Sequence, residues 1–98
     1  MINYRLSKAA INDLNEIWSY TYHKWSKEQA DKYYKGIIVA IEFIAKNFHS
    51  GKSLEDIKKG YRYSKVKSHL IFYRKSDQGH VEIVRILHQR MDIQRHIE

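Results

Sequence analysis

The chain has 98 residues, of which 43% are hydrophobic and 30% are charged. These values are typical of folded globular proteins and argue against intrinsic disorder. A chain of this length builds one hydrophobic core, so we predict a single domain over residues 1–98. The absence of cysteine excludes disulfides, cysteine nucleophiles and thiolate zinc sites.

Basic residues outnumber acidic ones, 18 to 11, and the excess is concentrated in one segment. Residues 49–75 carry eight basic and two acidic side chains, a local net charge of +6. Such a segment suits nucleic-acid phosphates or an acidic protein partner, and it is also compatible with a basic surface that has no partner.

Membrane insertion and secretion are not expected from the hydrophobic pattern. The longest uncharged apolar run, residues 36–41, is far shorter than the roughly 20 residues that cross a membrane. Arg5 and Lys8 interrupt the N-terminal segment before a signal-type run can build. We therefore expect a soluble cytoplasmic protein.

The first part of the chain predicts a short strand and a helix. Residues 1–6 alternate apolar and polar side chains, which is typical of an edge strand. Ser7 can cap a helix that ends near Lys24. The apolar positions of this helix recur every three or four residues, at Ile11, Leu14, Ile17, Trp18, Thr21 and Trp25.

A second helix is predicted directly after the first. Residues 26–29 (SKEQ) have the pattern of a capping box, and so short a connection requires the two helices to form an antiparallel hairpin. Gly36 lies inside this helix at a cost of about 1 kcal/mol relative to alanine. We expect it to let the first helix approach closely. The apolar stripe comprises Ala30, Tyr33, Ile37, Ile41, Ile44 and Phe48.

The remaining pattern predicts a loop over residues 52–60 and strands over 61–66, 69–75 and 81–88. Short connections make these strands an antiparallel meander, and the last strand, apolar on both sides, is predicted to be central. Residues 91–98 predict a final helical turn. The fold class is α+β, with the hairpin packed on one face of the sheet. The predicted core is Trp18, Ile37, Ile41, Ile44, Phe72, Ile83 and Leu87.

The chain lacks the usual patterns of metal, nucleotide and hydrolase sites. None of its six histidines has a partner at metal-ligand spacing, and its four glycines do not form a phosphate-binding loop. The acidic residues are scattered singly, which gives no support to a paired-carboxylate site or a Ser-His-Asp triad. We expect no metal and no cofactor.

A metal-independent ribonuclease is the remaining enzymatic candidate, because it needs only a base, an acid and cations. Arg74, Arg85, His88 and Arg90 supply such groups. Alternation along a strand puts Arg85 on the same face as Leu87 and opposite His88, so the set converges only if the strand end bends. The structural interpretation is that Arg85 covers the sheet surface and His88 hydrogen-bonds to a neighbouring backbone group.

Residues 85–92 (RILHQRMD) close a chain of one strand, two helices and three strands. This octet resembles the C-terminal signature of ParE-type toxins in the RelE/ParE superfamily of toxin–antitoxin systems. Residues 4–10 (YRLSKAA), the Asp13-Leu14 pair, and Tyr73-Arg74 before a glycine-containing hairpin also lie where that family has its strand, small residues and sheet. The resemblance covers essentially the whole chain.

The resemblance implies one of two activities. RelE-like members cleave messenger RNA on the ribosome, whereas ParE-like members poison DNA gyrase. Here Gln89 follows His88 where a nuclease would have a tyrosine, and residues 61–66 contain no glutamate to act as a base. The resemblance therefore favours a gyrase inhibitor, with a ribosome-dependent endoribonuclease using Arg74, Arg85 and His88 as the alternative.

The same resemblance implies binding surfaces for a target and an antitoxin. The antitoxin would be a ParD-like or other protein with an acidic, extended tail, bound in a hetero-oligomer. We expect it to contact three tyrosines that lie off the helical core stripe and two lysines of the basic segment, namely Tyr20, Tyr22, Tyr34, Lys65 and Lys67. We expect the gyrase-binding residues to be Arg85, His88, Arg90 and Arg95.

Overall fold

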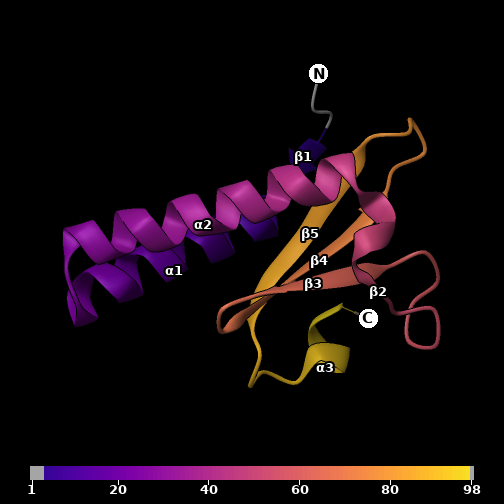
Figure 1. The fold of residues 1–98 in the computed structure, drawn as a ribbon. Helices are drawn as coiled ribbons and strands as arrows, with labels where there is room; N and C mark the ends of the chain where they lie inside the picture. Colours follow the sequence, from indigo (N-terminus) through magenta and orange to yellow (C-terminus); the bar gives the residue numbers. More distant parts are fainter. Residues whose placement is uncertain (1–3, 98) are drawn as a thin grey trace.

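The computed structural model describes residues 4–97 and contains a helical hairpin beside a mixed sheet (Figure 1). The predicted strand over residues 1–6 is observed from Tyr4 onward, and residues 1–3 and Glu98 lie outside the described residues. In chain order the elements are β1 (Tyr4–Leu6), α1 (Lys8–Lys24), α2 (Lys27–Lys46), the short 3₁₀ helix η1 (Phe48–Ser50), β2 (Lys52–Ser53), β3 (Arg62–Val66), β4 (His69–Lys75), β5 (Val81–His88) and α3 (Ile93–Ile97).

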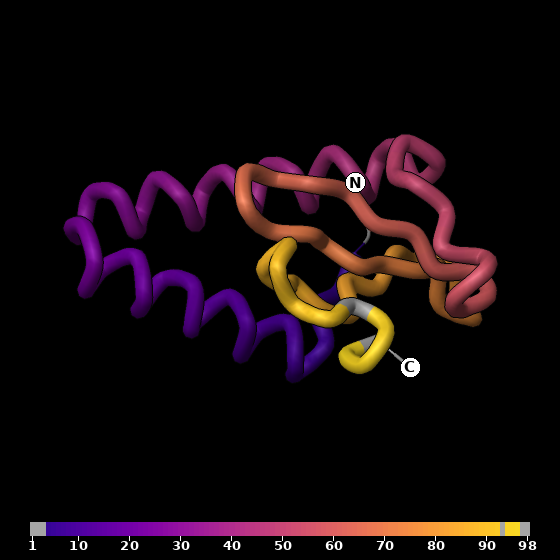
Figure 2. Tube along the Cα trace, turned by 90° about the horizontal axis from the view of Figure 1, so that it is seen from below, coloured from indigo at the N-terminus to yellow at the C-terminus, as the bar shows by residue number. Residues whose placement is uncertain are grey.

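The sheet has the strand order β1-β5-β4-β3-β2. The predicted antiparallel meander of β3, β4 and β5 is confirmed, and β1 pairs in parallel with β5 at one edge. The loop predicted over residues 52–60 contains one further strand, because Lys52 and Ser53 pair with Tyr63 and Arg62. The helical hairpin and α3 lie on opposite sides of the sheet (Figures 1 and 2).

The caps predicted from the sequence form the ends of the hairpin. The Ser7 hydroxyl accepts a hydrogen bond from the Ala10 amide, and the Ser26 hydroxyl accepts one from the Gln29 amide. These side chains satisfy amides that have no partner inside a helix. The first helix ends at Lys24, as predicted.

Two tryptophans that were predicted to be apolar contacts of the first helix lie elsewhere. Trp25 ends the helix and is 69% exposed. Trp18, predicted in the core, is only half-buried, and its indole N–H donates to the Asp31 carboxylate across the hairpin at 3.0 Å. The buried face of α1 is narrower than the predicted stripe and consists of Ala10, Asp13 and Leu14.

The core has two parts, one on each face of the sheet. Ile37, Ile41 and Ile44 pack with Ile71 and Ile83 on the face beneath the hairpin. Phe72 and Leu87, predicted to belong to the same core, pack instead on the other face. Their partners there include Leu54, Leu70, Tyr61 and Tyr63. The hairpin packs on one face as predicted, and the loop after β2 contributes Leu54 to a second cluster on the other face.

Gly36 does not mediate a close helix contact. A β-carbon built at this position meets no other atom within 4 Å. The glycine therefore costs helix stability without improving the packing.

We predict that Gly36→Ala stabilises the protein by about 0.5–1 kcal/mol, because alanine restricts the unfolded chain and is favoured inside helices. Urea unfolding measures the change. Gly51→Ala is the matched control and should destabilise, since its β-carbon would collide with the Tyr73 hydroxyl and the Tyr63 carbonyl. A loss of stability in Gly36→Ala would contradict the prediction.

Candidate functional site

An irregularity in β5 positions the site. Phe72 on β4 lies opposite Arg85, but the next residue, Tyr73, lies opposite Ile83. Val84 is therefore an extra residue without a partner on β4, which is a β-bulge. A bulge leaves backbone groups outside the ladder, and these groups need other partners.

The N-terminal part of α1 supplies those partners. The Ser7 amide donates to the Ile83 carbonyl at 3.0 Å, and the Ser7 hydroxyl donates to the Val84 carbonyl at 2.7 Å. The Asp13 carboxylate accepts a hydrogen bond from the Ile86 amide at 2.9 Å. The small side chain and the carboxylate of the N-terminal motif thus hold α1 on the bulge.

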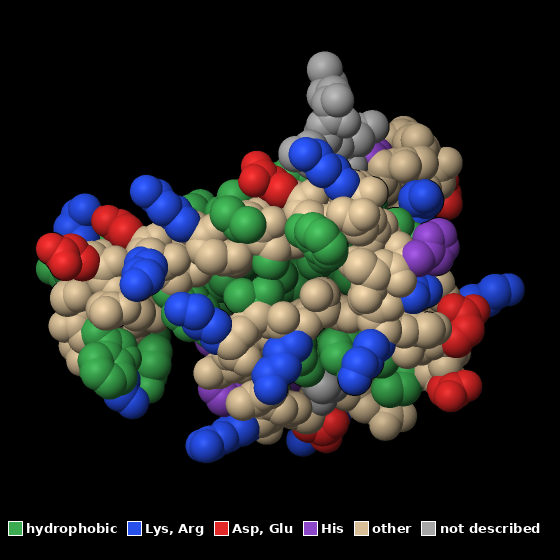
Figure 3. Space-filling model, in the orientation of Figure 1, with side chains coloured by type: hydrophobic (Ala, Val, Ile, Leu, Met, Phe, Trp, Pro, Cys, Tyr) green, Lys and Arg blue, Asp and Glu red, His purple; other side chains and the backbone are tan. Residues whose placement is uncertain are grey.

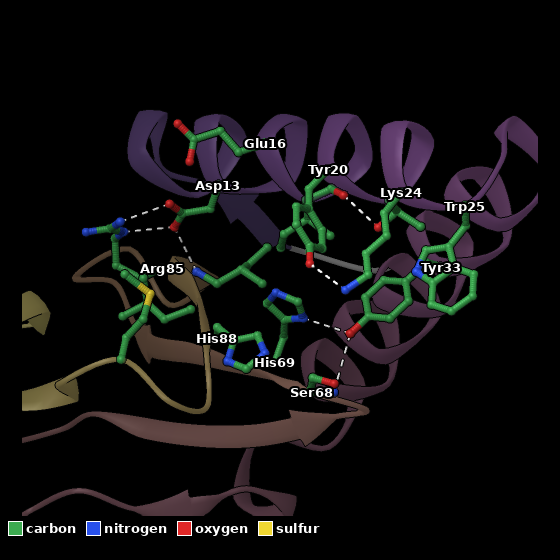
Figure 4. Close-up of a pocket in the computed structure, with 15 residues that line it drawn as sticks. Asp13, Glu16, Tyr20, Lys24, Trp25, Tyr33, Ser68, His69, Arg85 and His88 are labelled. Atoms are coloured by element: carbon green, nitrogen blue, oxygen red, sulfur yellow. Dashed lines mark hydrogen bonds and ion pairs between the residues drawn. The ribbon is translucent and has the colours of Figure 1, made fainter.

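Asp13 also binds Arg85, through two hydrogen bonds of 2.8 and 2.9 Å (Figure 4). The carboxylate is only 7% exposed, so its charge depends on this partner. Its hydrogen bonds raise the pKa of Arg85 further above the ordinary value. We call Ser7, Asp13 and Arg85 together the α1–β5 clamp.

A cleft of about 510 Å³ opens beside the clamp, between the hairpin and the adjacent ends of β4 and β5. Its walls combine aromatic rings, two histidines and the lysine at the end of α1 (Figure 4). The lining residues are Asp13, Glu16, Ile17, Tyr20, Thr21, Lys24, Trp25, Tyr33, Ser68, His69, Arg85, Ile86, Leu87, His88 and Met91.

The two histidines of the cleft are in contact. Their ring centroids are 5.2 Å apart with nearly perpendicular planes. The Tyr33 hydroxyl and His69 Nδ1 are hydrogen-bonded at 2.7 Å, and the Ser68 amide donates to the same hydroxyl. Burial, with a smaller contribution from the nearby His88, lowers the pKa of His69 to about 4. His69 is therefore a neutral structural group near pH 7.

The structure places only part of the predicted nuclease set together. Arg85 and His88 line the same cleft. They do so although β5 pairs regularly with β4 from Arg85 to His88, because Asp13 of α1 holds the Arg85 guanidinium beside the cleft. Arg74 lies at the other end of the ladder, where it forms an ion pair with Glu82 at 2.8 Å. The structural interpretation of His88 is confirmed, since His88 Nδ1 accepts a hydrogen bond from the Arg90 amide.

The other predicted binding residues are exposed but do not form one surface. Tyr20 lines the cleft, whereas Tyr34 borders a separate shallow hollow with Trp18 and Asp31. The Tyr22 ring stacks on that of Trp18 at 5.2 Å. Lys65 and Lys67 lie on and just after β3, and Arg90 and Arg95 lie after β5 and on α3.

Sequence reasoning did not assign roles to Asp13, Tyr33 or His69. Asp13 is part of the Asp13-Leu14 pair on which the family resemblance rests, so the sequence did mark this position. The contact between Tyr33 and His69 joins residues 36 positions apart and has no local pattern.

No group of three or more histidine, aspartate or glutamate side chains that could hold a metal ion occurs within residues 4–97. Among the same residues, no helix has the length and apolar character needed to cross a membrane.

A family model described as "ParE toxin of type II toxin-antitoxin system, parDE" matches residues 4–93. The chain belongs to this family. It is 42% identical to Toxin ParE1 of Mycobacterium tuberculosis, with 96% of both chains covered. It is 40% identical to Toxin ParE1 of Caulobacter vibrioides, again with 96% of both covered.

The fold is shared with a solved chain described as "Chromosomal ParDE TA system from P. aeruginosa". The TM-score is 0.77 at 18% sequence identity, with 90% of this chain and 96% of that chain covered. The ParE-type fold expected from the sequence is therefore confirmed.

Removing the Asp13 carboxylate should destabilise the fold strongly. We predict that Asp13→Ala costs about 3 kcal/mol, because it leaves Arg85 and the Ile86 amide without their acceptor. Glu82→Gln, which breaks the more exposed pair with Arg74, should cost less than about 1 kcal/mol. Urea unfolding of both variants checks the difference, and equal losses would contradict the role of the clamp.

Stability should also depend on the protonation of His69. Between pH 6.5 and 4 the unfolded state binds a proton near the ordinary histidine pKa, whereas the folded state does not, so stability falls as pH falls. Below pH 4 both states are protonated and this contribution stops changing. The groups that face His69 are Tyr33 on α2, His88 on β5 and Asp13 on α1.

We predict that His69→Asn has a shallower slope of unfolding free energy against pH in this window than the parent. His23→Asn, which changes an exposed residue of α1, serves as the control and should keep the parental slope. Chemical unfolding at half-unit pH intervals measures both. Parallel curves for His69→Asn and the parent would contradict the assignment.

Proposed function

We propose that this ParE family toxin inhibits DNA gyrase by binding it, without catalysis, and that a cognate antitoxin neutralises it. The observation that carries the proposal is the engagement of Arg85. Its guanidinium is held by two hydrogen bonds to Asp13. A cation committed in this way is poorly placed to stabilise the charge that develops on a phosphate during RNA cleavage.

The other members of the nuclease set give further support. Arg74 lies opposite Glu82 on the ladder, and Glu82 is six residues before His88 along β5. Six residues of a strand span on the order of 20 Å, so Arg74 is far from His88. Groups that act on one scissile bond must lie within hydrogen-bonding reach of it. His69, with a pKa of about 4, is a weak base at neutral pH.

The proposed gyrase-binding surface is the exposed segment that follows β5. Arg90 and Arg95 are exposed, and α3 lies on the side of the sheet away from the hairpin (Figure 1). Arginine suits bidentate contact with carboxylates or phosphates. Arg85 and His88, also expected to bind the target, would contribute from the neighbouring cleft. The protein would meet gyrase in the cytoplasm.

The proposed antitoxin carries an acidic, extended tail. The basic middle segment of the chain supplies charge complementarity, and the exposed rings of Tyr20, Tyr22 and Tyr34 supply the aromatic contacts that dominate many interfaces. Lys65 and Lys67 of this basic segment are also exposed. The likeness to a chain from a ParDE system is consistent with such a partner.

Gyrase supercoiling and DNA-cleavage assays, run beside a translation extract in which messenger RNA is probed for cuts, test the proposal. We predict that the purified protein inhibits gyrase and leaves messages intact.

Arg90→Glu combined with Arg95→Glu should relieve growth inhibition while thermal stability and antitoxin binding are kept, because both side chains are exposed. His88→Ala removes one of several proposed contacts and no proton-transfer group, so it should weaken toxicity without abolishing it.

The ribonuclease alternative gives the opposite results. Loss of a general acid typically lowers a rate by about 10²–10⁴-fold, so a folded His88→Ala protein would lose its toxicity. Cut messages in the extract would overturn the proposed mechanism. A charge-reversed double variant as toxic as the parent would overturn the proposed surface.

A further inference from the structure

The turn after β5 sets the direction of the segment that follows it. The Gln89 amide donates to the Ser68 carbonyl at 2.9 Å, and the Met91 amide donates to the His88 carbonyl at 3.0 Å. The Arg90 amide between them donates to the ring Nδ1 of His88 at 3.1 Å. Three successive amides are thus held by hydrogen bonds, and His88 accepts two of them.

Neighbouring residues of this turn have different environments. Met91 lines the cleft beside the hairpin, whereas the exposed Arg90 lies outside it. Figure 3 shows lysine and arginine side chains gathered on the lower part of the molecule, where Figure 1 places the end of β5 and α3. The conformation of the turn therefore decides whether the Arg90 guanidinium adds to this basic surface.

The His88 ring is itself held from the neighbouring strand. It lies against the ring of His69 on β4, with the centroids 5.2 Å apart and the planes at 81°. His69 is in turn hydrogen-bonded to the Tyr33 hydroxyl of α2 at 2.7 Å (Figure 4). Because burial lowers the pKa of His69 to about 4, His88 does not face a charged ring near pH 7. The row of Tyr33, His69 and His88 connects the hairpin to the turn.

The contact with Arg90 requires one arrangement of protons on His88. An amide N–H is only a donor, so the Nδ1 atom that accepts from it carries no proton. In the neutral ring the single proton is then on Nε2. His88 thus acts toward the turn as a hydrogen-bond acceptor at a defined atom.

We propose that His88 is a positioning residue, whose Nδ1 fixes the turn after β5 so that Arg90 projects toward the target. The inference rests on the proposed function, because the target is the gyrase surface proposed to bind Arg90 and Arg95. A side chain that hydrogen-bonds a nearby backbone amide restricts the conformations of the segment, and an ordered segment loses less entropy on binding. The Nδ1 atom of His88 would thus raise the affinity without touching gyrase.

Asparagine and glutamine separate this role from the loss of the ring. The Oδ1 atom of asparagine can occupy the position of Nδ1 in histidine, whereas the Oε1 atom of glutamine lies further out, near the position of Nε2. His88→Asn should therefore keep the acceptor for the Arg90 amide, and His88→Gln and His88→Ala should lose it. The control is His23→Ala, which removes an exposed histidine of α1. Thermal unfolding confirms that each variant is folded.

The first readout is gyrase supercoiling. We expect His88→Ala and His88→Gln to raise the half-inhibitory concentration by about three- to tenfold, which is the effect of one ordinary hydrogen bond. His88→Asn and His23→Ala should stay within about twofold of the parent. If His88 acts through Arg90, then His88→Ala should have little further effect in a protein that already carries Arg90→Ala.

The second readout is NMR of the protein without gyrase. At pH 8, above the ordinary histidine pKa of about 6.5, the nitrogen-15 shifts of the parental His88 ring should report a proton on Nε2 and none on Nδ1. The Arg90 amide should exchange with solvent at least about threefold faster in His88→Ala and His88→Gln than in the parent and His88→Asn. A residue that only fills space would not distinguish asparagine from glutamine in this way.

A proton found on Nδ1, or parental exchange of the Arg90 amide in His88→Ala, would overturn the inference. Additive effects of His88→Ala and Arg90→Ala would do the same. If folded His88→Asn is as weak against gyrase as His88→Ala, the ring itself contacts gyrase, so the positioning role fails while the proposed function stands. If the parent does not inhibit gyrase, the proposed function fails, and the NMR measurements still decide whether His88 holds Arg90.

Discussion

The attachment of α1 to the bulge of β5 is the constraint on which the rest of the structure depends. A buried carboxylate, Asp13, compensates both a cation and a backbone amide, so neither Arg85 nor Ile86 can move without exposing an unpaired group. The same contact sets the distance between the hairpin and the ends of β4 and β5. The ion pair between Asp13 and Arg85 therefore determines the shape of the cleft that contains the two histidines.

Much of the fold could be predicted because its signals are local. Ser7 and Ser26 precede helices and cap them, and turn residues separate the strands of the meander. The bulge could not be predicted, because the extra residue, Val84, is apolar like Ile83 before it and changes only the register. Trp18 and Trp25 were misplaced because helical periodicity continues into the part of the hairpin where no sheet lies beneath it (Figure 1).

The candidate site was predicted less well than the fold. Arg85 and His88 were identified from a motif, but a motif does not distinguish a reactive arginine from one that is neutralised by a distant aspartate. Asp13 and Arg85 are separated by 72 positions, and Tyr33 and His69 by 36. Such pairings arise from tertiary packing, and in this protein they decide which side chains remain available to a partner.

The bonds between the α1 N-terminus and β5 also bear on how the protein is made. They join Ser7 and Asp13 to residues 72 to 77 positions later, and within residues 4–97 β1 pairs only with β5. The helical hairpin can form early during synthesis because its contacts are local, but the sheet cannot receive β1 or close over α1 until the last strand has left the ribosome. Native structure is thus completed only after translation, and a chain truncated before β5 lacks the surface that follows this strand.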